Sequence, residues 1–178
     1  MALSRRALFR KGLLGGALLA LGGSAGIALR STRLGTPPRS PLRLFSAQEH
    51  AIFAAIAARI VPGDSAPAGW PRAHDVDCAG KADALLARVH PEVGRELTQL
   101  LRLFENGVTG LLLGKHPAPF TSLSPAAQDA RLQAWRTSGV ALLRTGYQAL
   151  ARLSTATYYA SPEVYERVGY PGPPEVPA

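Results

Sequence analysis

The side chains best suited to chemistry lie close together in one short segment. His74, Asp75, Asp77 and Cys78 fall within five residues of one another. Imidazole, carboxylate and thiolate groups are common ligands for transition metals in proteins. One interpretation is therefore a metal site in this segment. The other is an ordinary polar loop in which Cys78 packs as a small apolar side chain.

The remaining motifs favour no catalytic role. His50, His90 and His116 are scattered, and no two histidines have the H-x-x-x-H spacing that places two metal ligands on one helix face. The G-x-S-x-G spacing of serine hydrolases occurs once, at residues 22–26, inside the uncharged run near the N-terminus and with no strand pattern before it, so it gives no support for a serine hydrolase. With a single cysteine, the chain has no C-x-x-C-H haem site and no internal disulfide. We predict no catalytic, cofactor-binding or metal-binding residue in this chain.

Several aromatic side chains are candidates for a surface that contacts a partner. Tyrosine and tryptophan suit interfaces because one end of each side chain is apolar and the other is polar. A cofactor edge or the core of the protein are alternatives for those at helical spacing. The candidates are Trp135, Tyr158, Tyr159, Tyr165 and Tyr170, and the last two lie in a Pro-rich tail that could form an arm or pack on its own helices.

The N-terminus resembles a twin-arginine (Tat) export signal. The motif consists of Ser4, Arg5, Arg6, Leu8 and Phe9, and residues 12–29 follow without a charge. As a helix, that run would be about 27 Å long, near the thickness of the hydrocarbon core of a membrane. Its six glycines favour a signal over a permanent anchor. We expect the Tat translocase to deliver this protein to the periplasm, and an uncleaved leader that tethers it to the membrane is the alternative.

Charge is distributed unevenly along the chain. The net charge is +8, yet residues 1–43 contain eight Lys and Arg and no acidic residue, so residues 44–178 are neutral overall. A basic leader is typical of export signals, and a neutral body lacks the electrostatic surface that binds phosphates. This distribution argues against nucleic-acid binding.

The apolar pattern predicts a single all-α domain of four to five helices at residues 44–178, after a signal helix within residues 1–33 and a Pro-rich linker at 34–43. A capping box at Ser46–Glu49 begins the first helix, and Pro62 ends it. Further helices are expected at 77–89, from His90 to about 112, and from Ser124 to about 159, where a break at 137–139 would split the last in two. A short turn follows Ser161.

The order of several short segments resembles the gluconate 2-dehydrogenase subunit 3 family. The matching segments span residues 44–174, and none is specific alone. They are Leu44-Phe45-Ser46-Ala47-Gln48-Glu49, Arg59-Ile60-Val61-Pro62-Gly63-Asp64, Val76-Asp77, Lys81-Ala82-Asp83, Leu123-Ser124-Pro125 with Gln128, Tyr158-Tyr159-Ala160-Ser161-Pro162 and Val168-Gly169-Tyr170-Pro171-Gly172-Pro173.

The resemblance implies an accessory role. In that family a large GMC-type subunit holds FAD and oxidises a sugar, sugar acid or alcohol, and a multihaem cytochrome c accepts the electrons. The small subunit binds the large one and supplies its export signal, so the resemblance implies FAD and haem c in partner subunits. A stand-alone periplasmic enzyme with a metal at residues 74–78 and a membrane-tethered assembly protein are the alternatives.

Overall fold

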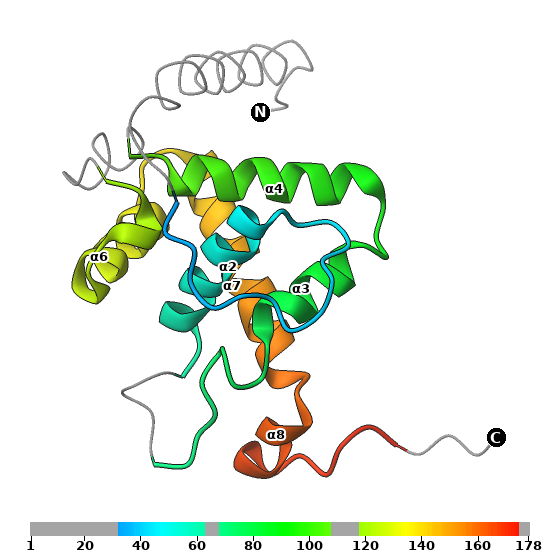
Figure 1. The fold of residues 1–178 in the computed structure, drawn as a ribbon. Coiled ribbons are helices and arrows are strands. Elements are labelled where there is room, and N and C mark those ends of the chain that lie inside the picture. The colour runs from blue at the N-terminus through cyan, green and yellow to red at the C-terminus, as the bar shows by residue number, and fades with distance from the viewer. Residues whose placement is uncertain (1–31, 63–67, 108–117, 175–178) are drawn as a thin grey trace, which may run out of the picture.

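The computed structural model describes residues 32–62, 68–107 and 118–174, and these residues form the all-α fold that the sequence predicts (Figure 1). The described part contains helices and no strand. The α-helices are α2 (Ala47–Ile60), α3 (Cys78–Leu86), α4 (Pro91–Glu105), α6 (Pro125–Arg136), α7 (Ala141–Tyr159) and α8 (Pro162–Tyr165). None of the helices in this part is long and apolar enough to cross a membrane. Residues 1–31 of the predicted leader at 1–33 lie outside the described residues.

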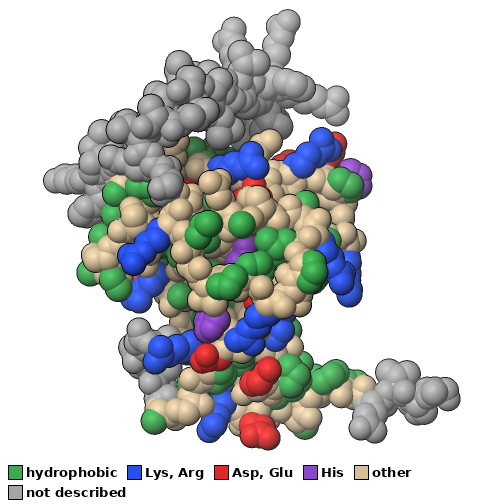
Figure 2. Space-filling view, viewed as in Figure 1, with side chains coloured by type: hydrophobic (Ala, Val, Ile, Leu, Met, Phe, Trp, Pro, Cys, Tyr) green, Lys and Arg blue, Asp and Glu red, His purple; other side chains and the backbone are tan. Residues whose placement is uncertain are grey.

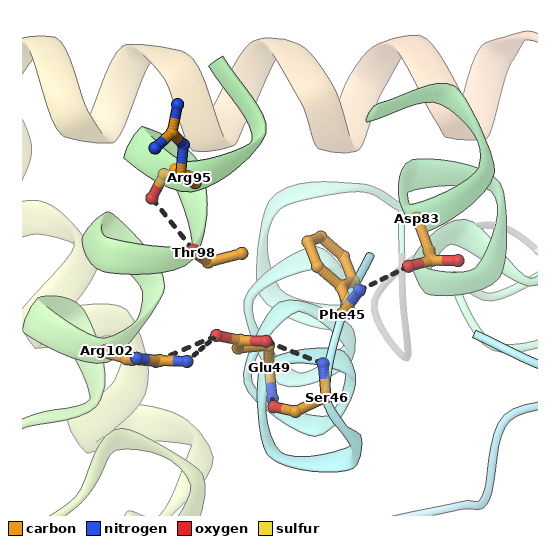
Figure 3. Close-up of polar contacts among 7 residues, drawn as sticks. All are labelled: Phe45, Ser46, Glu49, Asp83, Arg95, Thr98 and Arg102. Atoms are coloured by element: carbon orange, nitrogen blue, oxygen red, sulfur yellow. Dashed lines mark hydrogen bonds and ion pairs between the residues drawn. The ribbon is translucent and has the colours of Figure 1, made fainter. Parts of the chain in front are cut away.

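Helix α2 is the centre of the fold and packs against α3, α4, α6 and α7. The predicted capping box is confirmed, because the Ser46 hydroxyl accepts from the Glu49 amide and the Glu49 carboxylate accepts from the Ser46 amide at 2.7 Å. The same buried carboxylate binds the Arg102 guanidinium of α4 at 2.8 Å (Figure 3). Glu49 therefore both starts α2 and joins it to α4.

Two helices are shorter than the sequence predicts. Helix α3 begins after Asp77, which caps it from a left-handed backbone conformation (φ 51°), and ends at Leu86 rather than at residue 89. Helix α4 ends at Glu105, because Asn106 has an extended conformation (φ −62°, ψ 126°) that interrupts the expected run to residue 112. Residues 108–112 lie outside the described residues. Because the apolar pattern continues past Asn106, the sequence gives no indication that the helix ends there.

The second half of the fold follows the predicted boundaries closely. Ser124 caps α6 with Pro125 at its first position, and the break at 137–139 separates α6 from α7. Helix α7 is the longest helix described and packs against α2, α3, α6 and α8. The turn after Ser161 is the single-turn helix α8. An unpredicted 3-10 turn, η1 (Phe120–Ser122), places Phe120 in the core against Phe104.

The linker follows the surface of the helical body in an extended path, and we call residues 32–45 the strap. At one end, the Arg33 amide donates to the Thr121 hydroxyl. In the middle, the Arg39 guanidinium donates to the carbonyl groups of His74 and Asp75 at 2.8 and 3.2 Å. At its other end, the strap enters α2. The strap is therefore bonded to the body along its length.

The strongest attachment of the strap is the buried carboxylate of Asp83 on α3. It accepts three backbone N–H groups, from Arg43 at 2.7 Å, Leu44 at 2.9 Å and Phe45 at 2.6 Å. Figure 3 shows the last of these contacts. Asp83 is almost fully buried, so the three amides are its replacement for water. This side chain fixes where the strap ends and α2 begins.

Candidate partner-binding surfaces

The polar residues between 74 and 78 separate into different structural roles. The Asp77 carboxylate caps α3 by accepting from the Gly80 amide at 3.2 Å. The Asp75 carboxylate accepts from the Arg72 amide at 2.8 Å. The His74 side chain is exposed, and Cys78 is buried in the core. Within the described ranges, no three His, Cys, Asp or Glu side chains converge as metal ligands. The geometry of this segment thus favours a structured polar loop.

Cys78 is placed where its thiol is unreactive. The residue is 1% exposed, and burial raises the pKa of its thiol to about 11. The thiolate is the nucleophile and the metal ligand, so a thiol that stays protonated at neutral pH is a poor candidate for either role.

We expect Cys78 of the folded protein to resist alkylation. At pH 7.5, iodoacetamide should modify it on the order of a hundredfold more slowly than an unperturbed thiol, since thiolate is scarce and access is blocked. Mass spectrometry of the intact chain measures the reaction. The same protein in urea should react quickly and serves as its own control, whereas rapid labelling of the folded protein would contradict the burial.

His50 faces a cavity of about 380 Å³ between the strap and the alanine-rich face of α2. The residue is 5% exposed, and its Nε2 atom has no hydrogen-bond partner in the structure. Burial lowers the pKa of its imidazole, and the charges of Asp77 and Asp83 oppose that shift only in part. Burial of His50 therefore favours its neutral form.

This burial predicts a pH-dependent stability. Below about pH 6.5, His50 binds a proton more readily in the unfolded chain than in the folded chain, so its contribution to stability should fall as the pH falls from 7 toward 5. One proton contributes at most about 1.4 kcal/mol per pH unit. Urea denaturation of wild type and His50→Gln at each pH isolates this contribution. As the pH falls, the free energy of unfolding of wild type should decrease more than that of His50→Gln. A difference that stays constant with pH would refute the lowered pKa of His50.

Glu105 has the opposite effect on stability as the pH falls. The contribution of His50 must therefore be isolated by comparing wild type with His50→Gln. Its side chain accepts from the Thr121 amide at 3.1 Å and from the Thr121 hydroxyl at 2.6 Å. Burial nonetheless raises the pKa of this carboxyl, while the Thr121 hydrogen bonds and the Arg131 charge lower it in part. The folded state binds this proton more readily than the unfolded state does, so acidification favours folding through Glu105. The two groups therefore have opposite effects on the pH dependence of the wild type.

The five aromatic candidates divide into core and surface residues. Trp135 and Tyr158 are both 0% exposed. The Trp135 ring lies 4.7 Å from that of Phe104, and the Tyr158 hydroxyl donates to the Pro71 carbonyl at 2.7 Å. These two therefore hold the body together and are removed from the set of surface candidates. Tyr159 and Tyr170 are exposed, and Tyr165 is half-buried.

The surface aromatics lie where α7 ends and the tail begins. The Tyr165 and Tyr170 rings meet edge to face at 5.0 Å, and the Tyr170 amide donates to the Tyr165 carbonyl at 2.9 Å. The start of the tail is thus folded back on α8 and is not a free arm up to residue 170. The predicted export residues Ser4, Arg5, Arg6, Leu8 and Phe9 lie outside the described residues, as does His116.

A second apolar surface was not predicted as a site. It is a groove of about 580 Å³ between α4 and α7, and we call it the α4–α7 groove. Its walls include Leu97 and Leu100 of α4 with Leu142 and Leu153 of α7. The sequence does contain a signal for this groove. The apolar stripe on α4 includes Val93 and Leu103 and is therefore wider than packing on one face requires.

Charged side chains form no continuous basic patch on the face seen in Figure 2, where Lys and Arg are interspersed with Asp, Glu and apolar residues. This distribution agrees with the neutral body that the sequence shows. Within the described residues, two candidate surfaces for a partner are the aromatic end of α7 and the α4–α7 groove, and both are apolar. Such surfaces are typical of proteins that bind other proteins.

The comparisons with known proteins identify the family. The family model described as gluconate 2-dehydrogenase subunit 3 matches residues 47–172, which extend from the first residue of α2 into the tail. No curated protein and no solved structure matches the chain. The match includes every helix described above and most of the chain. On that evidence, this chain belongs to the gluconate 2-dehydrogenase subunit 3 family.

Proposed function

We propose that this chain is a non-catalytic small subunit that binds a FAD-dependent, GMC-type dehydrogenase subunit, helps it fold and carries it through the Tat translocase to the periplasm. The observation that carries this proposal is a family match over residues 47–172, preceded by the Arg5-Arg6 leader. The large subunit would oxidise a sugar, sugar acid or alcohol. Its electrons would pass to a multihaem cytochrome c.

The buried polar groups of this chain support an accessory role, because each of them makes contacts that stabilise the fold. Asp83 holds the strap, Glu49 joins α2 to α4, and Glu105 binds Thr121. Each is engaged within the fold, away from a common cleft. The apolar groove and the aromatic surface instead suit the burial of a partner. The proposal includes FAD and haem c in the partner subunits.

The proposal is tested in a strain that lacks this chain. The large subunit should remain in the cytoplasm and should contain less FAD, because it has lost both its export signal and its folding partner. Fractionation followed by immunoblotting and flavin fluorescence measures both effects. A plasmid copy of the full chain should restore them. Full periplasmic activity of the large subunit without this chain would refute the proposal.

A further inference from the structure

The α4–α7 groove is an apolar channel lined at its base by Gly146 and by Trp135, a core side chain that has no exposed surface of its own. A Cβ atom at Gly146 would lie 3.0 Å from the Trp135 ring and 2.8 Å from Leu100, so the floor is closely packed. The walls above it stay open. Leu142 is 60% exposed and Val93 is 48% exposed, although both line the groove. The groove therefore combines a closely packed floor with exposed walls.

Exposed apolar side chains gather on the segments that form this groove. Of the large apolar side chains that are exposed in the described ranges, most belong to the end of α3, the start of α4 and the start of α7. They are Leu85, Val89, Val93, Val140 and Leu142. Contiguous exposed apolar surface on a folded domain marks an interaction site. The groove is thus a candidate interaction site.

Two possible occupants fit this groove poorly. A two-fold dimer centred on the groove would set two concave surfaces against each other and leave space between them. The chain's own leader emerges at Thr32 and Arg33, where the Arg33 amide is bonded to Thr121 beside Glu105. Glu105 lies nine residues after Glu96, which lines the groove. Nine residues are two and a half helical turns, so the two side chains lie on opposite sides of α4. The leader therefore begins on the opposite side of that helix.

The charge at the rim indicates what occupant would fit. Glu96 lines the groove, and Glu92 lies one turn earlier on the same edge of α4. Helix α4 has 15 residues, so its edge is about 22 Å long and matches several turns of a second helix. An amphipathic helix binds such a groove through apolar residues at i, i+3, i+4 and i+7. A basic residue beside that stripe would complement the two glutamates.

We infer that the α4–α7 groove binds an amphipathic helix of the large dehydrogenase subunit, with a Lys or Arg of that helix beside Glu92 and Glu96. This inference rests on the proposed function. It assigns the main contact to the groove, and the aromatic end of α7 becomes secondary. The apolar walls supply affinity, and the acidic rim sets the orientation of the helix.

Two matched variants test the inference in the full chain co-expressed with its large subunit. Leu142→Glu places a charge in the groove, and Leu34→Glu makes the same change in the strap at equal exposure (60% and 61%). Affinity capture of the large subunit should fall at least tenfold with Leu142→Glu and stay unchanged with Leu34→Glu. Circular dichroism should show both variants folded, as their side chains are at the surface. Equal capture by both folded variants would overturn the inference.

A photo-crosslinking amino acid in place of the exposed Ala149, which lines the groove, identifies the occupant. The expected product joins this chain to a predicted amphipathic helix of the large subunit. Products with residues 1–31, with a second copy of this chain, or with no protein at all in the intact complex would each overturn the inference. If wild type captures no large subunit, the proposed function fails as well. If wild type and Leu142→Glu capture it equally, only the groove assignment fails.

Discussion

Replacing Asp83 by alanine is expected to lower the free energy of unfolding by about 3 kcal/mol, a large share of the roughly 5–15 kcal/mol typical of a domain. The substitution removes the acceptor of three backbone N–H groups, from Arg43, Leu44 and Phe45. Hydrogen bonds to a charged acceptor contribute about 1.5–3 kcal/mol each, and the effects within one cluster do not add. The start of α2 and the strap should loosen together.

Urea denaturation measures the effect through the midpoint of the transition. The slope of the transition must also be compared, since the midpoint reports stability only if the slope is unchanged. Asp129→Ala is a matched control, because Asp129 forms an ion pair with Arg59 at 2.6 Å at the surface. Exposed pairs contribute about 0–1 kcal/mol, so this variant should be nearly as stable as wild type. Asp83→Asn should be intermediate, since Oδ1 still accepts from Leu44 and Phe45 while its NH₂ group opposes the Arg43 amide. Equal stabilities for Asp83→Ala and Asp129→Ala would contradict the role of the buried carboxylate.

The double substitution Arg5→Lys and Arg6→Lys is expected to abolish export and leave this chain and its large subunit in the cytoplasm. The charge is preserved, but the planar guanidinium groups are lost, and lysine does not replace arginine where such geometry is recognised. Fractionation with immunoblotting of both subunits measures the effect, which should exceed tenfold in periplasmic yield. The folded body should be unchanged, because its described contacts begin at Thr32 and Arg33.

A control for this effect changes two other arginines of the N-terminal region. Arg30→Lys with Arg33→Lys preserves the charge in the same way but leaves the Arg5-Arg6 pair intact. Arg33 contributes its backbone amide to the bond with Thr121, so this bond persists in the variant. The control should be exported at the wild-type level. Normal export of the Arg5→Lys, Arg6→Lys protein would show that this leader is not read as a twin-arginine signal.

The sequence predicted well those features that depend on neighbouring residues. Ser46 with Glu49 and Ser124 with Pro125 begin α2 and α6 as expected, because a helix N-terminus is satisfied by groups within three residues of it. The helical period of the apolar residues predicted the all-α class, and the order of short segments indicated the family. The end of α4 at Asn106 was missed, since the apolar pattern on either side of it continues without a change.

Contacts between distant residues were decided by the tertiary structure. Tryptophan and tyrosine suit both core and interface, and only packing shows that Trp135 and Tyr158 are buried while Tyr159 and Tyr170 are not. The bond between Asp83 and Phe45 joins residues 38 positions apart, and no local pattern marks it. The α4–α7 groove likewise depends on how two separate helices diverge. The sequence alone determined the helical class, the main helix starts and the family, because these follow from local order, whereas burial and the docking surfaces depend on how the helices pack.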